Sequence, residues 1–460
     1  MVRIEISIHT TQEKNMTDLN NVPHIRVTPP GPESIRWHGR AEKHMKGYSS
    51  QVGLFPVVFE KGEGNVIIDV DGNTYIDFSS GIYCNSTGHC HPKVVEKIKE
   101  YAGKLLNCHD FTTPIKTMFL EKMASFLPGN LSGIQLYCGG SEAVEAALRT
   151  VRTVKGGKYE MFSFWGDWHG KTGASMSLSS LGGTVFGPRS AGCHLAPVPD
   201  CYRCPFKLSY PGCELTCADV LEGMIDNEGT GAQAAFIMEP VQGYSGAVVY
   251  RDEIFTRISE ICSARDMLLV VDEVLTGMGR TGKMFCVEHY DLEPDVIVFG
   301  KGTAGGFPLS GIAVKEEYSQ SLEKMSASTT YGGNPLACAA AYATLEVFEE
   351  ENLLENVNRV GAYIMERLVK MKETHRIIGD VRGKGLLLAI DLVKDKNTRE
   401  PFKEAGRMVY KKAFSKGVAW IPAENVLRLA PPLIMTEKLA EKALEIIDES
   451  IWEAEKHFSC

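Results

Sequence analysis

Two apolar segments of the chain each end in a side chain that could do chemistry. The run Met267–Val271 is followed directly by Asp272, and the run 296–299 is followed by Lys301, which stands between two glycines. Such apolar runs predict strands that are buried on both faces, and the carboxyl ends of strands in open α/β sheets face the ligand crevice. A lysine that is partly desolvated and deprotonated can form an imine. Taken singly, Asp272 also fits a helix cap and Lys301 a solvated lysine.

Two further segments could hold a flat, phosphorylated ligand. Residues 137–142 read Tyr-Cys-Gly-Gly-Ser-Glu and predict a strand that turns through glycines into a helix beginning at Glu142. Exposed N–H groups and the positive end of the helix dipole suit a phosphate there. Trp168 precedes His169 and Gly170, and its ring could stack on a planar cofactor. A plain strand–helix turn and a core tryptophan are the alternatives, but the four features together indicate pyridoxal 5'-phosphate.

With these features the chain resembles the class III aminotransferases. They are fold-type I pyridoxal-phosphate enzymes and include 4-aminobutyrate aminotransferase and dialkylglycine decarboxylase. The matching segments follow the family's order over roughly residues 50–435. These segments are Gly139–Ala143, Trp168–Gly170, Glu239–Gly243, Asp272–Val274, Gly277–Gly282, Gly300–Lys301, Thr330–Pro335 and Arg428–Pro432.

The resemblance implies a cofactor site and its residues. Gly140 and Ser141 would bind the phosphate, and Trp168 and Val274 would cover the two faces of the ring. The resemblance also implies that Asp272 pairs with the ring nitrogen. The catalytic residues would be Asp272 and Lys301, with Lys301 carrying the cofactor as a Schiff base.

The resemblance further implies an aminotransferase that acts in two half-reactions. An amine or amino acid would leave its amino group on the cofactor as pyridoxamine phosphate, which would pass it to a 2-oxo acid. Arg428 would bind a substrate carboxylate with its bidentate fork. Thr330 would reach the phosphate in the neighbouring subunit, which implies a homodimer with shared active sites.

Three substrate-facing positions depart from patterns found within the family. Ile82 follows Ser80-Gly81 where the decarboxylating member has a glutamine, and an apolar side chain cannot hydrogen-bond a departing carboxylate. Lys171 follows His-Gly where ω-aminotransferases commonly have arginine, and it lacks the bidentate fork. Tyr244 replaces a glutamate that can neutralise the substrate-binding arginine. Arg428 should therefore stay available for an α-carboxylate.

Two alternative activities remain on the same scaffold. A racemase or epimerase would return the proton to the substrate carbon, and none of the motifs excludes that outcome. A decarboxylating transaminase is disfavoured by Ile82. A non-catalytic binding protein would be a third reading, but the chain keeps Lys301, Asp272, Ser141 and Arg428.

Four cysteines form two close pairs in a proline-containing segment, Cys201 with Cys204 and Cys213 with Cys217. Four thiolates at such spacings could hold tetrahedral zinc. Reduced cysteines in a loop and a disulfide are the other possibilities. The chemistry implied by the resemblance needs no metal, so no metal ligand is assigned.

The pattern around these residues predicts an α/β fold with a mostly parallel central sheet and a smaller α+β domain built from both chain ends. We expect residues 1–93 to contribute an N-terminal segment and part of the small domain. Residues 94–335 should form the large cofactor-binding domain, and residues 336–460 the rest of the small domain. Thr436 is expected to cap the last helix.

Composition limits the partners. The chain has 460 residues, which exceeds a single hydrophobic core. Its formal charge of −9 argues against nucleic-acid partners, since phosphate backbones require a basic face. No apolar run is long enough to span a membrane, and the first 20 residues are polar, without the apolar core of a secretory signal. We therefore expect a cytoplasmic enzyme with reduced cysteines.

Overall fold

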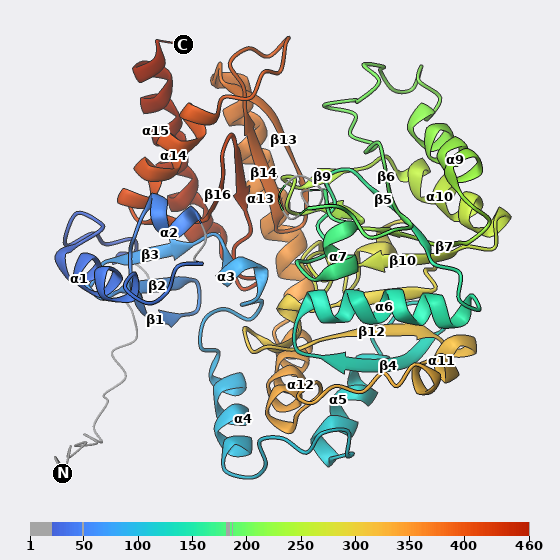
Figure 1. Ribbon diagram of the computed structural model, residues 1–460. Helices are drawn as coiled ribbons and strands as arrows, with labels where there is room; N and C mark the ends of the chain where they lie inside the picture. Colours follow the sequence, from blue (N-terminus) through green and yellow to red (C-terminus); the bar gives the residue numbers. More distant parts are fainter. Residues whose placement is uncertain (1–20, 48–49, 181–184, 186, 460) are drawn as a thin grey trace.

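The computed structural model describes residues 21–47, 50–180, 185 and 187–459. The polar segment that shows no secretory signal, residues 1–20, lies outside this part. Along the chain a small sheet comes first, then the central sheet, and then a second small sheet with long helices (Figure 1).

The central sheet has seven strands in the order β4-β12-β11-β10-β7-β5-β6. Strands β11, β10, β7, β5 and β6 run parallel to one another, while β12 is antiparallel to both β11 and β4. The prediction of a mostly parallel α/β sheet is confirmed. The strands span Leu131–Tyr137 (β4), Glu160–Phe164 (β5), Cys193–Ala196 (β6), Gln233–Met238 (β7), Leu268–Asp272 (β10), Val296–Phe299 (β11) and Ser310–Lys315 (β12).

Both faces of this sheet are buried, which explains why its strands read as continuous apolar runs. Side chains alternate between two hydrophobic clusters along each strand. On β10, Leu268 and Val270 belong to the cluster beneath helix α6 (Gly140–Val154), while Leu269 and Val271 belong to the cluster on the other face. Strand β11 alternates in the same way.

Several helices surround the central sheet. Helix α6 packs on β11 and β12, and α10 packs on β10. On the other side of the molecule, α12 packs against α4 and α5 (Figure 1). The helices of this region are Pro92–Ala102 (α4), Pro114–Ala124 (α5), Gly173–Ser177 (α7), Thr216–Glu228 (α9), Asp252–Ala264 (α10), Ser319–Lys324 (α11) and Pro335–Glu350 (α12), with 3-10 turns Cys286–His289 (η2), Lys301–Ala304 (η3) and Glu316–Tyr318 (η4).

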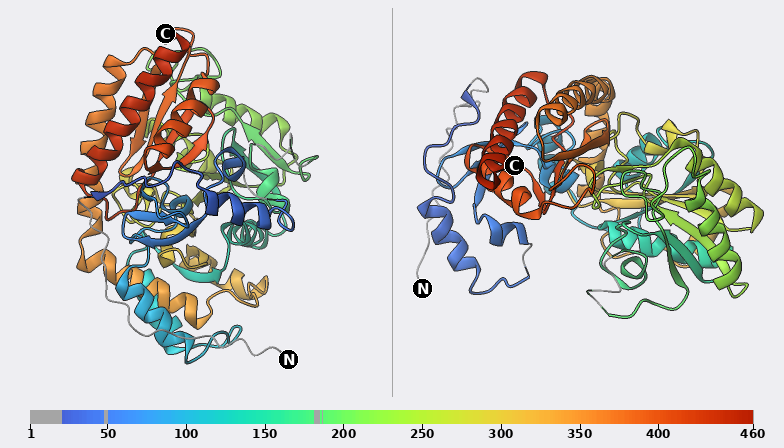
Figure 2. Two further views of the ribbon diagram at one scale, coloured as in Figure 1. Left: turned by 90° about the vertical axis from the view of Figure 1, so that its left-hand side faces the viewer. Right: turned by 90° about the horizontal axis from the view of Figure 1, so that it is seen from above.

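Two four-stranded sheets and the long C-terminal helices form the rest of the molecule. The first sheet has the order β1-β2-β3-β15, so strands from both halves of the chain pair in it. The second has the order β13-β14-β17-β16 and lies beside helices α13, α14 and α15 (Figure 2). The elements are Pro32–Ala41 (α1), Ser50–Leu54 (α2), Phe59–Glu63 (β1), Val66–Asp69 (β2), Thr74–Asp77 (β3), Ser80–Tyr83 (α3), Val241–Gln242 (β8), Val248–Val249 (β9), Leu353–Thr374 (α13), Ile378–Lys384 (β13), Leu387–Leu392 (β14), Lys403–Ser415 (α14), Val418–Ala419 (β15), Ile421–Ala423 (β16), Val426–Leu429 (β17) and Glu437–Phe458 (α15).

The structure tests two predictions of where a helix begins. Thr436 is the N-cap of α15, and its side chain accepts a hydrogen bond from the backbone N–H of Leu439, so this prediction is confirmed. The prediction that a helix begins at Glu142 is wrong by two residues, because α6 begins at Gly140. The carboxylate of Glu142 accepts the N–H groups of Cys138 and Gly139 and draws the turn into the helix.

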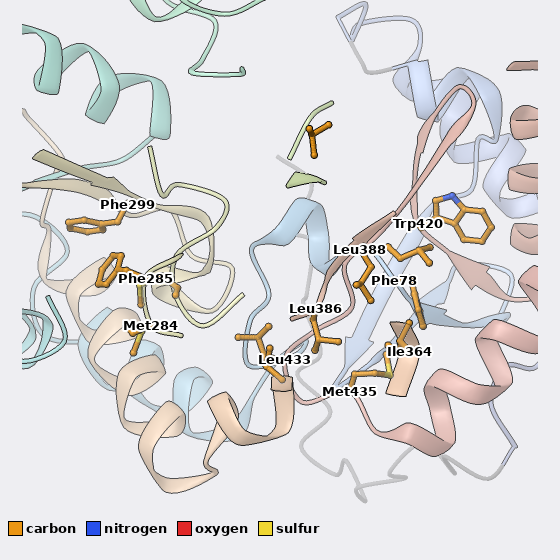
Figure 3. Close-up of a cluster of buried hydrophobic side chains, with 14 of the residues drawn as sticks. Phe78, Met284, Phe285, Phe299, Ile364, Leu386, Leu388, Trp420, Leu433 and Met435 are labelled. Atoms are coloured by element: carbon orange, nitrogen blue, oxygen red, sulfur yellow. The ribbon is translucent and has the colours of Figure 1, made fainter. Parts of the chain in front are cut away.

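The main hydrophobic core continues from the central sheet to the small sheets. Phe285 and Phe299 occupy its central-sheet end, while Leu388 and Trp420 occupy the other end (Figure 3). Among the residues that the structure describes, none of the helices combines the length and apolar character needed to cross a bilayer.

Phe236 tests how tightly the central sheet is packed. It is fully buried on β7, and its ring meets that of Phe164 edge to face at 4.9 Å. We expect Phe236→Ala to lower the free energy of unfolding by about 3–5 kcal/mol, because the lost ring leaves a cavity. Phe236→Leu should cost less, since leucine refills most of the space. Equal losses in chemical denaturation of the two variants would contradict this packing.

Candidate active site

Asp272 and Lys301 lie in the same cavity because the strands that lead to them are neighbours. Strands β10 and β11 pair in parallel, with Asp272 opposite Val298, so both strands end at the same edge of the sheet. The two side chains line one cavity of about 380 Å³. The same cavity is lined by four other residues singled out in the sequence: Gly140, Ser141, Trp168 and Val274.

The N-terminus of α6 forms one end of this cavity. Its first residues, Gly140 and Ser141, lie at the positive end of a 15-residue helix. The Ser141 hydroxyl accepts the backbone N–H of Lys171 at 3.1 Å. Gly170 allows this close approach, because a side-chain carbon on Gly170 would lie 2.4 Å from the Ser141 oxygen. The loop that follows Trp168 is thereby held against the start of the helix.

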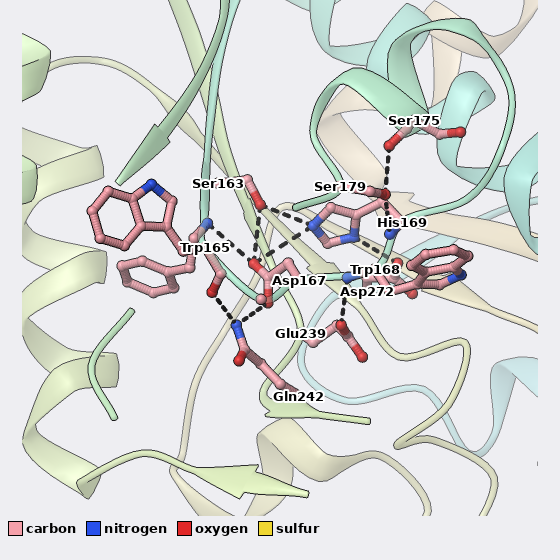
Figure 4. Close-up of polar contacts among 12 residues, drawn as sticks. Ser163, Trp165, Asp167, Trp168, His169, Ser175, Ser179, Glu239, Gln242 and Asp272 are labelled. Atoms are coloured by element: carbon pink, nitrogen blue, oxygen red, sulfur yellow. Dashed lines mark hydrogen bonds and ion pairs between the residues drawn. The ribbon is translucent and has the colours of Figure 1, made fainter. Parts of the chain in front are cut away.

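Beneath the cavity, Asp272 belongs to a buried network of charged and polar side chains (Figure 4). His169 Nδ1 lies 2.8 Å from Asp272 Oδ2, and His169 Nε2 lies 3.0 Å from the Ser163 hydroxyl and 3.6 Å from Asp167 Oδ2. Gln242 Nε2 donates to Asp167 Oδ1 at 2.9 Å. One histidine therefore sits between two buried carboxylates.

The charges in this network stabilise one another. Burial alone would lower the pKa of His169, but its hydrogen bonds to Asp167 and Asp272, and their negative charges, raise that pKa to about 10. His169 is therefore an imidazolium at neutral pH, with both ring nitrogens donating. Its positive charge lies against the carboxylate of Asp272, which is only 3% exposed.

Glu239 lies close to this network, and its surroundings disfavour its charged form. Burial first, and then the negative charges of Asp167 and Asp272, raise the pKa of Glu239 to about 8, while His169 partly offsets the increase. The two carboxyl oxygens of Glu239 accept the backbone N–H groups of Trp168 at 2.7 Å and Gly243 at 3.0 Å. Glu239 thus ties the segment that carries Trp168 to the turn that follows β8.

Three residues of this region have unfavourable backbone conformations. Lys301, which lines the cavity, has φ of +41°, and Ile82 and Tyr83, which line a second cavity beside it, have φ of +65° and +67°. A β-branched residue such as Ile82 rarely takes this left-handed conformation. Such strain persists where the surroundings hold it, and it is concentrated at functional sites.

A second, smaller cavity of about 90 Å³ adjoins the first and shares Trp168, Asp272, Val274 and Lys301 with it. Arg428 and Tyr244 line only this second cavity, together with Ile82 and other side chains. The prediction that Arg428, Tyr244 and Ile82 lie near the reacting centre is therefore consistent with the geometry.

Two of the sequence-selected residues lie apart from these cavities. Lys171 is exposed, with its ammonium 5.6 Å from the centre of the Trp168 ring. Thr330 lines neither cavity and is exposed, with its carbonyl oxygen accepting the Asn107 side-chain amide at 3.0 Å.

These residues fit pyridoxal 5'-phosphate by the chemistry of their donor groups. A helix N-terminus with a serine suits a phosphate, an indole ring and Val274 offer surfaces for a flat ring, and a buried anionic carboxylate suits a protonated ring nitrogen. Lys301 supplies an amine in the same cavity. The cavity thus offers a partner for each part of such a cofactor.

The residues that support Asp272 cannot be recognised from the sequence pattern. His169 stands out only as the neighbour of Trp168, and the pattern assigns no function to Asp167 or Glu239. The available signal was the spacing of Asp167, Trp168 and His169, in which the acid and the histidine flank the aromatic ring. Nothing in one sequence indicates that this turn lies under Asp272, because the two segments are 103 residues apart.

The four clustered cysteines, Cys201, Cys204, Cys213 and Cys217, line one cavity of about 30 Å³ that is separate from both active-site cavities. All four are free thiols. In the described part of the chain, no group of three or more histidine, cysteine or acidic residues is arranged to hold a metal ion.

Comparison with known proteins identifies relatives over most of the chain. The family model described as "Aminotransferase class-III" matches residues 48–451. The leucine/methionine racemase of Thermococcus litoralis is 34% identical over 91% of this chain and 97% of its own length. The 5-aminovalerate aminotransferase of Pseudomonas putida is 37% identical over 86% of this chain and 93% of its own. An amine transaminase from an uncultivated Pseudomonas species, solved in its PLP-bound form, superimposes with a TM-score of 0.84 at 30% identity, covering 89% of this chain and 98% of its own.

The imidazolium of His169 predicts a specific pH dependence of stability. The pKa of His169 is raised on folding, so its contribution should be complete below about pH 6.5, the ordinary pKa of histidine. The contribution should be lost as the pH rises towards about 10. We expect His169→Gln to lower the free energy of unfolding, and the difference from wild type should become smaller as the pH rises through this range. A difference that does not change with pH would contradict the assignment. The control is His44→Gln, at an exposed histidine.

Proposed function

The chain belongs to the class-III aminotransferases, and we propose that Lys301 and Asp272 are its catalytic residues. The enzyme is a pyridoxal-phosphate-dependent aminotransferase of fold type I that moves an amino group from an amine or amino acid to a 2-oxo acid. The observation that carries the residue assignment is that Asp272 and Lys301 end adjacent parallel strands and line one cavity with Trp168 and Val274.

When bound, pyridoxal phosphate bonds covalently to amino groups and delocalises the electron pair left behind when a proton leaves the neighbouring carbon. Lys301 holds the cofactor through its Nζ in the resting enzyme. Displaced from the cofactor by a substrate amine, the same nitrogen would be the group that takes up and delivers a proton. Its place in the cavity with Asp272 supports this role.

Asp272 keeps the ring nitrogen of the cofactor protonated. The imidazolium of His169 holds one oxygen of this carboxylate at 2.8 Å. Trp168 and Val274 would cover the two faces of the ring, and Gly140 and Ser141 would bind the phosphate at the start of α6. The place of each side chain in the cavity of about 380 Å³ supports these roles.

Arg428 binds the substrate carboxylate, and Ile82, Lys171 and Tyr244 shape the space around the substrate. Arg428 lines the smaller cavity together with Ile82 and Tyr244, next to Lys301. Ile82 offers no hydrogen bond to a departing carboxylate, which supports transamination over decarboxylation. Lys171 is exposed and lines neither cavity, but its ammonium lies 5.6 Å from the centre of the Trp168 ring, which supports a role beside the substrate.

We propose that the enzyme works as a homodimer in which Thr330 contacts the cofactor phosphate of the partner. Exposed apolar side chains near Thr330 support this proposal, since exposed apolar groups that cluster commonly mark interfaces. Asn107 ties the segment carrying Leu105 and Leu106 to Thr330. The large exposed side chains of this region are Leu105, Leu106, Phe111 and Tyr331.

The free thiols of the described cysteines fit a reducing compartment and support the cytoplasm as the location of the enzyme.

Racemisation is the second candidate activity, because a relative that is 34% identical carries the name leucine/methionine racemase. A racemase would return the proton to the substrate carbon from the other face instead of delivering it to the cofactor. Loss of optical rotation without formation of a 2-oxo acid would identify this activity.

The spectrum of the purified enzyme tests the role of Lys301. We expect a visible absorption band that bleaches with an amino donor and returns when a 2-oxo acid is added. Lys301→Ala should lose turnover by several orders of magnitude, because both the resting attachment and the proton transfer depend on Nζ. Lys370→Ala, at an exposed lysine of α13 that lines neither cavity, is the matched control and should keep the band. A Lys301→Ala enzyme that still completes the cycle would overturn the assignment.

A further inference from the structure

Four thiols outside the active site line one small cavity. The cavity of about 30 Å³ is bordered by Cys201, Cys204, Cys213 and Cys217, none of which lines either active-site cavity. All four are free. They lie between the end of β6 and the first turn of α9, where Cys217 is the second helical residue. Any chemistry of these thiols is therefore separate from that of Lys301.

The surroundings of the thiols favour a bond between two of them over a bound metal ion. Within the ranges that the structure describes, no three or more histidine, cysteine or acidic side chains are arranged to hold a metal. Two thiols, in contrast, need no further ligand to form a disulfide. The walls between them are largely apolar and include Val198, Phe206, Leu208, Leu215 and Ile254.

Cys217 is the buried member that lies within electrostatic reach of other thiols. Burial, and to a lesser extent the negative charges of Cys201 and Cys213, raise the pKa of Cys217 to about 11. Backbone N–H groups at the start of α9 partly offset this increase. Because ionisation does not stabilise the reduced form of such a thiol at neutral pH, a disulfide that includes Cys217 should not be a strong oxidant.

Cys201 differs from Cys217 in its access to solvent. Cys201 is exposed, whereas the other three thiols of the cluster are partly buried. It also lines a second, larger cavity of about 410 Å³, together with Tyr202 and Arg382. A small molecule therefore reaches the sulfur of Cys201 first, and access decides which thiol begins an exchange reaction.

The backbone beside Cys201 is held in place. Asp200 Oδ1 accepts the N–H groups of Tyr202 at 2.8 Å and of Arg203 at 3.1 Å. The guanidinium of Arg203 bonds both carboxylate oxygens of Asp391, a fully buried residue of β14. These contacts fix the position from which Cys201 meets the cavity.

The segment that leads to Cys217 is held by separate contacts. The Tyr210 hydroxyl donates to Glu253 of α10 at 2.6 Å, and the guanidinium carbon of Arg251 lies 4.8 Å from the centre of the Tyr210 ring. The N–H of Thr216 donates to the Cys213 carbonyl at 2.9 Å. With both segments held, the thiols have a high effective concentration towards one another.

We propose that Cys201 and Cys217 form a redox-active pair that exchanges with low-molecular-weight disulfides such as oxidised glutathione. The Cys201 thiolate attacks one sulfur of the small disulfide, which gives a mixed disulfide and releases one small thiol. Cys217 then loses its proton to water and attacks the Cys201 sulfur, which closes the Cys201–Cys217 bond and releases the second small thiol. The protein loses two electrons and two protons, and the small disulfide gains them.

Peptide mapping tests the proposal on the holoenzyme. The reduced protein is freed of reductant, incubated with oxidised glutathione, alkylated and digested. Mass spectrometry should find a peptide pair joined through Cys201 and Cys217, and dithiothreitol should restore both thiols. In the reduced protein, iodoacetamide should label Cys201 at least about 10-fold faster than Cys217, because Cys201 is exposed and Cys217 stays protonated.

Single variants separate the two steps. Cys217→Ser should stop the reaction at the mixed disulfide, so that Cys201 keeps one glutathionyl group. Cys201→Ser should slow the oxidation of Cys217 at least about 10-fold, because the accessible attacking thiol is lost. The matched control is Cys90→Ser, at an exposed cysteine that borders none of these cavities, and it should form the same disulfide as wild type.

Three outcomes would overturn the inference. A disulfide from Cys201 to Cys204 or Cys213 would show that the pairing is wrong. Thiols that stay unchanged in millimolar oxidised glutathione would show that the pair is not redox-active. Zinc that copurifies with the wild-type protein and is released by a thiol-blocking reagent would show that the cysteines are metal ligands. If a serine variant does not fold, the wild-type cross-link and labelling rates still decide.

Discussion

The active site depends on a buried carboxylate whose negative charge must be compensated. Asp272 ends a strand that is covered on both faces, and it is 3% exposed. A charge buried without a partner is costly, because burial removes its hydration. His169 supplies the partner at 2.8 Å, and Asp167, Ser163 and Gln242 complete the network around the imidazolium. The position of the Asp272 carboxylate therefore depends on five side chains together.

The sheet topology brings Asp272 together with Lys301 and the start of helix α6. Asp272 and Lys301 end neighbouring parallel strands, and the helix that starts at Gly140 packs across β11 and β12. Antiparallel β12 links β11 to β4, the strand that leads into that helix. Glu239 then connects Trp168 to the turn of Tyr244 through its two oxygens. Cofactor site and substrate site thus share one rigid frame.

The sequence was informative where the physics is local. Apolar runs that alternate between two buried faces predicted β10 and β11, and the side chain at the end of each run was found in the cavity. The predicted helix start differs from the observed one because Gly140, before Ser141, adopts a helical conformation, which the low helix propensity of glycine does not favour. The partners of Asp272 and the stack of Tyr244 on Trp168 come from contacts between distant segments, which no local pattern encodes.

Asp272, paired with His169, is proposed to stabilise the protonated form of the ring nitrogen of the cofactor. The ¹⁵N chemical shift of ring-labelled pyridoxal phosphate bound to the enzyme measures this protonation directly. We expect a protonated ring nitrogen in the wild-type enzyme at pH 8 and a neutral one in Asp272→Asn. If both proteins give the same shift, the protonation does not depend on this carboxylate and the role assigned to Asp272 is wrong.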